Sequence, residues 1–149
     1  MDLKVVEKPW GKEEWLVVTG KYCLKRLYIN EGHRLSLQYH KVKLETMFLE
    51  EGVCDLVVVG RTRLMEKGQP YTIKPNEVHR LIARKDSVIL EVSTPELNDV
   101  VRLEDDYKRE EKKLLHEKHD LELGEYNTQE RREKIFKKVE NEGNTKKSN

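Results

Sequence analysis

Short runs of apolar or alternating residues, separated by turn signals, fill the first two thirds of the chain. Glycine, proline, asparagine and aspartate mark the turns, for example at Asn30–Gly32 and Pro75–Asn76. Because many short strands follow one another with no long amphipathic helix between them, the pattern predicts an all-β sandwich or barrel. Val57–Val59 and Val88–Leu90 are continuous apolar runs, so we expect them to be buried on both faces. The predicted strands span Glu14–Val18, Tyr22–Ile29, Leu35–His40, Glu45–Leu49, Val53–Val59, Thr62–Met65, Tyr71–Ile73, Val78–Ala83 and Ser87–Ser93.

The pattern changes after Pro95, where charged residues replace the apolar runs. Lys, Arg, Asp and Glu make up 32 of the 103 residues in Met1–Leu103 and 25 of the 46 residues in Glu104–Asn149. This difference predicts a folded β-domain over residues 1–103 and a charged, partly helical C-terminal extension over residues 104–149. Within the extension, Asn127–Glu142 begins with a capping box and carries a narrow apolar stripe, which predicts a helix. We expect the last residues, Asn144–Asn149, to be disordered.

Charge and hydropathy narrow the partners and the location of the protein. The net charge is +1 at neutral pH, which provides no bulk attraction to nucleic acid or to an anionic membrane. No apolar run is long enough to span a bilayer, and the first residues form no apolar signal segment. We therefore expect a cytoplasmic protein without a nucleic-acid or membrane partner. Cys23 and Cys54 stand singly in apolar runs, which predicts buried, unpaired thiols.

Candidate metal ligands gather in the middle of the predicted β-domain. Gln38 and His40 lie two positions apart on one predicted strand, so their side chains point to the same face. Glu45 opens the next predicted strand, and we expect the two strands to form a hairpin that brings the three side chains together. His79 follows a later turn and is the candidate for the fourth ligand. Two histidines, a carboxylate and an amide oxygen suit a divalent metal ion such as Zn, Mn, Fe, Co or Ni, although Gln38 can instead hydrogen-bond a water.

Two spaced motifs resemble those of the cupin superfamily. The first spans Gly32–Gly52 and reads Gly, five residues, Gln-Tyr-His, four residues, Glu, six residues, Gly, with Gln38 where the superfamily usually has His. The second keeps the expected spacing from Gly68 to His79, with two substitutions between them. The resemblance implies an all-β, cupin-type double-stranded β-helix, a small barrel of the jelly-roll type.

Four segments narrow the resemblance to one group within the superfamily. These segments are Lys8–Gly11, Arg34–His40, Val78–Leu81 and Val101–Tyr107. They resemble the cupin domain of the bifunctional type II mannose-6-phosphate isomerase/mannose-1-phosphate guanylyltransferases. In that group Gln, His, Glu and His bind the metal, which the resemblance places at Gln38, His40, Glu45 and His79. It implies a metal-dependent aldose–ketose isomerase acting on mannose 6-phosphate or a related sugar phosphate, and a homodimer. Lys41–Met47 departs from the usual His-His-Arg-Ala-Glu-His-Trp, which leaves the substrate open.

Charged residues supply candidates for catalysis and substrate binding. Glu91 lies in an apolar strand, where a carboxylate needs a partner or a function, so it is the candidate base; an ion pair with Arg or Lys is the alternative. Arg80 is the second catalytic candidate. Arg34, which shares strand parity with the ligands if its strand begins early enough, and Lys25 are the candidates for holding the phosphate. For each cation, solvated surface charge is the alternative.

Two other functions fit the same residues. The His, His and Glu set is also used by Fe(II) dioxygenases, which consume oxygen whereas an isomerase does not. A non-catalytic barrel that binds a sugar or a nucleotide-sugar, with the metal as a structural element, predicts tight binding without turnover.

Overall fold

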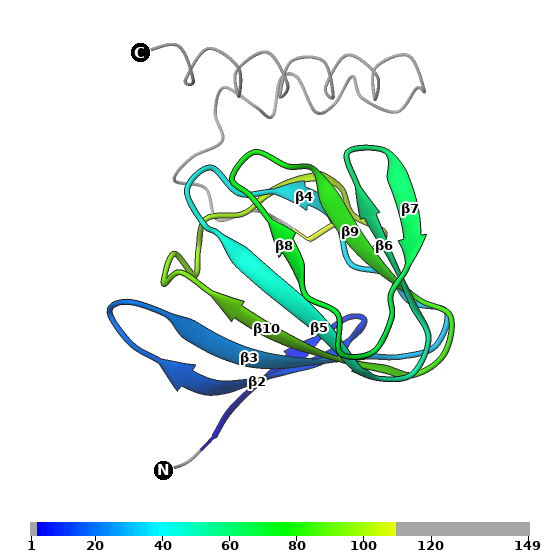
Figure 1. The fold of residues 1–149 in the computed structure, drawn as a ribbon, viewed down its shortest axis with the longest axis horizontal. Helices are drawn as coiled ribbons and strands as arrows, with labels where there is room; N and C mark the ends of the chain where they lie inside the picture. The colour runs from blue at the N-terminus through cyan, green and yellow to red at the C-terminus, as the bar shows by residue number, and fades with distance from the viewer. Residues whose placement is uncertain (1–2, 110–149) are drawn as a thin grey trace.

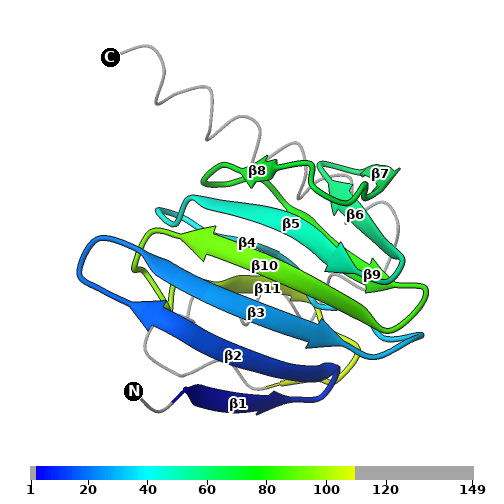
Figure 2. The same ribbon diagram turned by 60° about the horizontal axis from the view of Figure 1, so that its bottom comes forward.

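The computed structural model describes residues 3–109, which form two antiparallel β-sheets that face each other (Figures 1 and 2). Sheet A contains, in spatial order, β1 (Lys4–Lys8), β2 (Gly11–Val18), β3 (Cys23–Ile29), β10 (Ser87–Ser93), β5 (Glu45–Glu51) and β8 (Tyr71–Ile73). Sheet B contains β11 (Val101–Glu104), β4 (Leu37–Tyr39), β9 (His79–Ala83), β6 (Cys54–Val58) and β7 (Arg61–Leu64). The all-β prediction is therefore confirmed for the described residues. Within residues 3–109 no helix has the length and apolarity needed to cross a membrane.

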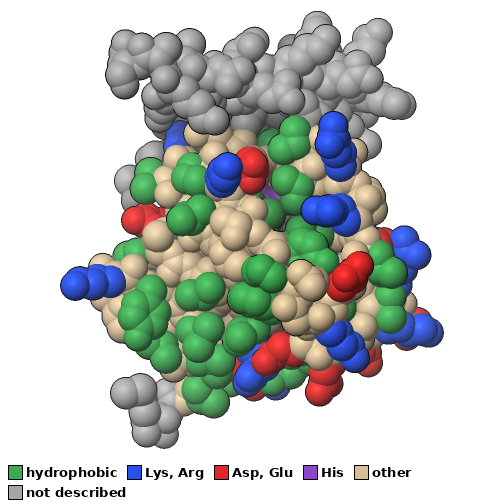
Figure 3. Space-filling model, in the orientation of Figure 1, with side chains coloured by type: hydrophobic (Ala, Val, Ile, Leu, Met, Phe, Trp, Pro, Cys, Tyr) green, Lys and Arg blue, Asp and Glu red, His purple; other side chains and the backbone are tan. Residues whose placement is uncertain are grey.

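Each predicted strand overlaps an observed one, from β2 to β10. The sequence pattern missed β1 and β11, which lie at the edges of their sheets. The prediction that Val57–Val59 and Val88–Leu90 are buried on both faces was wrong. All three residues of Val57–Val59 stay at least partly exposed, and in Val88–Leu90 only the middle residue is buried. Figure 3 shows that hydrophobic side chains gather at the surface over β2, β3 and β10 of sheet A. Val92, on β10, is 37% exposed.

The predicted hairpin between the first two ligand-bearing strands does not form. β4 pairs with β9 and β11 in sheet B, whereas β5 pairs with β10 and β8 in sheet A. Residues Lys41–Leu44 therefore cross from one sheet to the other instead of turning back along the same sheet. As a result, the candidate ligands come from both walls of the barrel.

The main apolar core fills the space between the two sheets. Every second residue of β3 is buried, and Leu27 and Ile29 are 2% and 1% exposed. Trp10 anchors the turn between β1 and β2 in this core, at 2% exposure. Since the apolar residues occupy one part of the interior, the remaining inward positions are free to carry polar groups. The other core members are Met47, Leu49, Cys54, Leu56, Met65, Ile73, Leu81, Ala83 and Ile89.

A smaller apolar cluster lies on the other face of β4. Leu37 and Tyr39 pack there with Val78 and Val101, and all four are buried. Because side chains alternate along a strand, this cluster directs the neighbouring positions of β4 toward the barrel interior. The apolar residues of β4 thus fix the direction of its polar ones.

Two glycines are required where strands approach closely. A Cβ on Gly11 would lie 1.8 Å from the backbone oxygen of Tyr28, and Gly11 has a φ of +150°. A Cβ on Gly52, the last residue of the first motif, would lie 2.1 Å from the backbone oxygen of Asp86, at a φ of +90°. A side chain at either position would push β2 or the end of β5 away from its neighbour.

Other predictions meet the structure in different ways. Cys23 and Cys54 are buried and unpaired, as predicted. The helix over Asn127–Glu142 and the disordered end lie outside the described residues, so the charged helical extension stays a prediction. The domain boundary at residue 103 also stays a prediction.

Candidate metal centre

Three predicted ligands converge at one buried point. The Nε2 atom of His79 lies 2.9 Å from Oε1 of Glu45, and the Nε2 atom of His40 lies 3.4 Å from the same oxygen. The two imidazole rings are 5.1 Å apart, and the ligand atoms all lie within 4.8 Å of one another. Each of the three side chains is 2% or 3% exposed. His40 directly follows β4, while Glu45 begins β5 and His79 begins β9, so the loops at one end of the barrel bring them together.

Backbone carbonyls set the orientation of both imidazoles. Nδ1 of His40 contacts the carbonyl oxygen of Asp99, and Nδ1 of His79 lies 2.8 Å from the carbonyl oxygen of Glu77. A carbonyl only accepts a hydrogen bond, so each Nδ1 carries the proton in the neutral ring. Each Nε2 therefore directs a lone pair at the centre, which is the arrangement of metal-bound histidines.

The chemistry of these donor atoms fits a bound cation. Within the described residues, neither Nε2 atom has a hydrogen-bond partner, although both are buried beside a carboxylate oxygen. A lone pair facing a carboxylate oxygen is repulsive unless a positive charge lies between them. Burial would raise the pKa of Glu45, but hydrogen bonds from His40 and His79, which require protonated Nε2 atoms when no metal is bound, and the Lys43 ammonium group outweigh burial and hold the pKa well below its usual value. The carboxylate is thus kept in the form that binds metals.

Gln38 lies beside this group. It points inward with His40, because the two are separated by one residue on the same chain segment, and it is the register partner of His79. Its Oε1 atom accepts a hydrogen bond of 2.6 Å from the hydroxyl group of Ser36. Its role as fourth ligand stays a prediction.

Asp99 supports the centre and was missed by the sequence analysis. Its carboxylate accepts hydrogen bonds from the backbone amides of Lys41, Val42 and Lys43, at 3.0, 2.7 and 2.8 Å. Burial would raise the pKa of Asp99, but these amides, with Lys43 first, lower it below the usual value. Asp99 therefore holds the crossing loop with its side chain and the ring of His40 with its own carbonyl oxygen. The one sequence signal was the turn-forming composition around it.

Lys43 is the second missed residue. Its ammonium nitrogen lies 2.7 Å from Oε2 of Glu45 and 2.9 Å from Oε1 of Glu91, and its side chain is 8% exposed. Burial lowers the pKa of Lys43, and the carboxylates of Glu91 and Glu45 more than reverse this effect, so the pKa is raised. A cation two residues before Glu45, where the resembled isomerases read Arg, was the signal that pointed to it.

The other predicted site residues separate into two groups. Glu91 lies on the inner face and forms the ion pair that was its alternative, with Lys43. Lys25 lies on the same inner face as the register partner of Glu91; its ammonium nitrogen is 3.6 Å from Glu13 and 4.7 Å from the ring centre of Trp15. Glu91 and Lys25 are thus neighbours on the inner face of sheet A and can belong to the same site.

The structure does not bring Arg80 and Arg34 to this point. Arg80 follows His79 directly and so faces the other side of β9, where it binds the carbonyl oxygen of Leu35 and the carboxylate of Glu104. Arg34 precedes β4, too early to share its parity, and pairs with Asp106 at 2.6 Å. Their roles as catalytic and phosphate-binding residues stay predictions that this geometry does not support.

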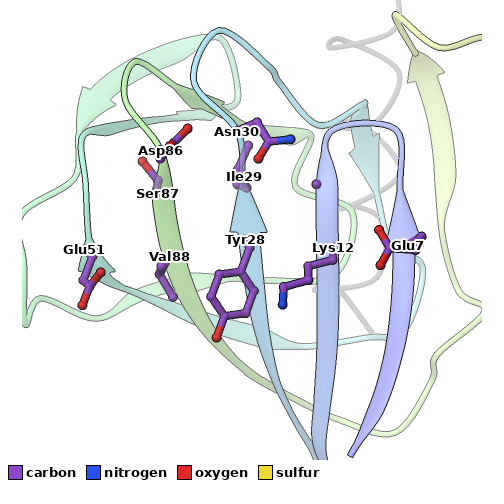
Figure 4. Close-up of a pocket in the computed structure, with 10 residues that line it drawn as sticks. Glu7, Lys12, Tyr28, Ile29, Asn30, Glu51, Asp86, Ser87 and Val88 are labelled. Carbon is purple, nitrogen blue, oxygen red and sulfur yellow. The ribbon is translucent and has the colours of Figure 1, made fainter.

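A separate depression lies away from the centre, on the outer face of sheet A (Figure 4). It has a volume of about 400 Å³ and follows one row of register partners across the sheet, from Glu7 and Lys12 through Tyr28 and Val88 to Glu51. The ammonium nitrogen of Lys12 lies 4.6 Å from the ring centre of Tyr28. None of the three converging ligands lines this depression.

The fold and the metal centre can now be compared with those of known proteins. An RmlC-like cupin from Shewanella frigidimarina superimposes with a TM-score of 0.59 at 13% identity, covering 65% of this chain and 87% of that one. The fold is thus that of cupins, a double-stranded β-helix. The chain belongs to the family described as Mannose-6-phosphate isomerase C-terminal, which it matches over residues 2–112.

Curated relatives are longer proteins. The alginate biosynthesis protein AlgA of Pseudomonas aeruginosa is 30% identical over 110 residues, which is 70% of this chain and 23% of AlgA. The mannose-1-phosphate guanylyltransferase ManC of Salmonella typhimurium is 29% identical over 109 residues, with the same coverage of 70% and 23%. The chain therefore spans about a quarter of the length of these relatives.

Proposed function

We propose that the barrel is a metal-dependent sugar-phosphate isomerase that acts on mannose 6-phosphate or a related sugar phosphate. The observation that carries this proposal is the buried convergence of two imidazole lone pairs and one carboxylate oxygen. Membership of a family described as the C-terminal part of mannose-6-phosphate isomerase supports the reaction and its substrate class. Relatives named for mannose 1-phosphate and alginate chemistry support a sugar phosphate as ligand.

The metal would be held by Nε2 of His40, Nε2 of His79 and Oε1 of Glu45, with Gln38 beside them. Nitrogen and oxygen donors of this kind suit Zn, Mn, Fe, Co or Ni. A bound divalent ion would polarise a carbonyl group and ease removal of a proton from the adjacent carbon.

The inner face of sheet A supplies the remaining groups. Glu91 is the candidate base, since Lys43 binds its Oε1 atom and Oε2 takes no part in that ion pair. Oε2 would accept the proton from one carbon of the sugar and return it to the neighbouring carbon. A second proton would move from the hydroxyl oxygen of the first carbon to the carbonyl oxygen of the second, which completes the conversion of an aldose to a ketose. Lys25, beside Glu91 on the next strand, is the candidate for binding the phosphate. Arg34 and Arg80 have no part in this proposal, because they face the other side of sheet B.

The test combines metal analysis with a coupled isomerase assay on mannose 6-phosphate. We expect about one ion per chain in the purified protein, and turnover that disappears with a chelator and returns with a divalent ion. His40→Ala with His79→Ala should remove the metal and the activity. His33→Ala is the matched control, because His33 stacks on Tyr107 and is not part of the centre. Full metal content in the double variant would contradict the ligand assignment.

One observation favours a non-catalytic sugar-binding barrel as second candidate. The carboxylate of Glu91 is already engaged by a buried ammonium group, which makes it a weaker proton acceptor than a free carboxylate. Calorimetric binding of mannose 6-phosphate or a nucleotide-sugar, without turnover in the presence of metal, would establish this candidate over the isomerase. Oxygen uptake by the Fe(II)-loaded protein would instead identify a dioxygenase.

A further inference from the structure

The two oxygens of Glu45 face different partners. Oε1 lies 2.9 Å from Nε2 of His79 and 3.4 Å from Nε2 of His40. Oε2 lies 2.7 Å from the ammonium nitrogen of Lys43, in an ion pair whose side chains are 8% and 2% exposed. A carboxylate binds a metal through one oxygen or through both. Coordination by both oxygens would require Oε2 to leave a buried ammonium group without its partner, which is costly.

Lys43 engages a second buried carboxylate in the same way. Its nitrogen lies 2.9 Å from Oε1 of Glu91, whose side chain is 9% exposed. Without this ammonium group, Glu45 and Glu91 would be two neighbouring carboxylates inside the barrel. Two adjacent buried carboxylates repel each other and attract a cation, so Glu91 would become a competing ligand. Lys43 therefore stands between Glu45 and the second carboxylate, that of Glu91.

We propose that Lys43 is a positioning residue that restricts Glu45 to coordination through Oε1 alone and keeps Glu91 out of the metal's ligand set. This inference rests on the proposed metal centre. It leaves coordination positions on the ion for a ligand with two adjacent oxygens, such as the carbonyl and neighbouring hydroxyl groups of an open-chain sugar. Lys43 thus connects the ligand count of the centre to the substrate class.

The experiment uses cobalt(II) alone as the probe, because its visible absorption weakens as its coordination number rises. The wild-type chain, Lys43→Met and Lys43→Arg are loaded with cobalt(II) and compared. We expect Lys43→Met to show clearly weaker visible bands, because Oε2 and Glu91 are released to the ion. Lys43→Arg keeps the cation and should retain the wild-type spectrum. Bound cobalt(II) with an unchanged spectrum in Lys43→Met would overturn the inference.

A second measurement on the wild-type chain does not depend on whether the variants fold. X-ray absorption or a crystal structure of the cobalt(II)-loaded protein should show one oxygen of Glu45 on the metal and no oxygen of Glu91. Two Glu45 oxygens at bonding distance would overturn the role of Lys43 while leaving the metal centre intact. Failure of the wild-type chain to take up cobalt(II) would instead overturn the proposed centre itself.

Discussion

Two groups of charged side chains lie on different faces of the barrel, and they differ in what they can do. The inner cluster consists of Lys43, Glu45 and Glu91, whose side chains are 8%, 2% and 9% exposed. The outer pair, Arg34 and Asp106, has a shorter contact of 2.6 Å, but its side chains are 39% and 37% exposed. Residue types and distances are similar, so burial makes the difference: water screens the outer pair and is excluded from the inner cluster. Contact distance alone is therefore a poor guide to which ion pairs matter.

The largest effect expected from this comparison is on stability. Lys43→Met leaves two buried carboxylates without their partner, and removing one member of a buried ion pair typically costs about 3–5 kcal/mol. Urea denaturation of the metal-free protein should show this loss. A change below about 1 kcal/mol, the range of exposed pairs, would show that the inner cluster is hydrated and that the contrast with the outer pair does not hold.

A smaller loss is expected at the residue that supports the crossing loop. Asp99→Asn replaces one of the two oxygens that accept backbone hydrogen bonds with an amide donor, and losing such a hydrogen bond typically costs about 0.5–1.5 kcal/mol. Because the loop held by the Asp99 side chain joins His40 to Glu45, the affinity for zinc should fall in a chelator competition. Asp106→Asn is the control and should retain the affinity. Equal zinc affinities in Asp99→Asn and Asp106→Asn would show that the hydrogen bonds to the loop do not affect metal binding.

The pH dependence of stability gives a third, smaller contrast. The native pKa of Asp99 is lower than its ordinary value of 3.8. A carboxyl group with a lowered native pKa stabilises the fold above its ordinary pKa, and this contribution is lost as the pH falls through the native pKa. The stability difference between wild type and Asp99→Asn should thus be constant above pH 3.8 and shrink below it. Denaturation curves at a series of pH values test this. A stability difference that grows on acidification would mean that the native pKa of Asp99 is raised instead of lowered.

The smallest effect belongs to the outer pair. Arg34→Met should change the free energy of unfolding by about 0–1 kcal/mol, because both partners are solvated. Added salt should reduce even this difference. A loss as large as that expected for Lys43→Met would mean that the outer face of sheet B is covered in solution.

The sequence was informative where the local pattern determines the outcome. Strand positions followed from alternation, and so did the shared direction of Gln38 and His40. Because side chains alternate along a strand, Arg80 must point to the face opposite that of His79. The sequence alone could therefore have predicted that Arg80 lies outside the metal centre. The sequence did not predict that β4 and β5 belong to different sheets, because the pattern of residues within a strand does not determine which strand it pairs with.

Long-range support was also beyond the sequence. Asp99 contacts the amide of Val42 across 57 residues, and no spacing rule links a turn-forming aspartate to a loop so far away. Lys43 differs, because its charge within an otherwise ligand-bearing segment was visible. What the sequence lacked was the burial that turns this charge into a partner of Glu45 and Glu91.

The crossing of residues Lys41–Leu44 between the sheets has a mechanical consequence. His40 and His79 belong to the wall formed by sheet B, and Glu45 belongs to the wall formed by sheet A. An ion bound by His40, His79 and Glu45 would cross-link the two sheets at the end of the barrel where charged groups replace apolar contacts. Loading the protein with metal should then raise its melting temperature with each increase in free ion concentration, since only the closed barrel presents all three donors.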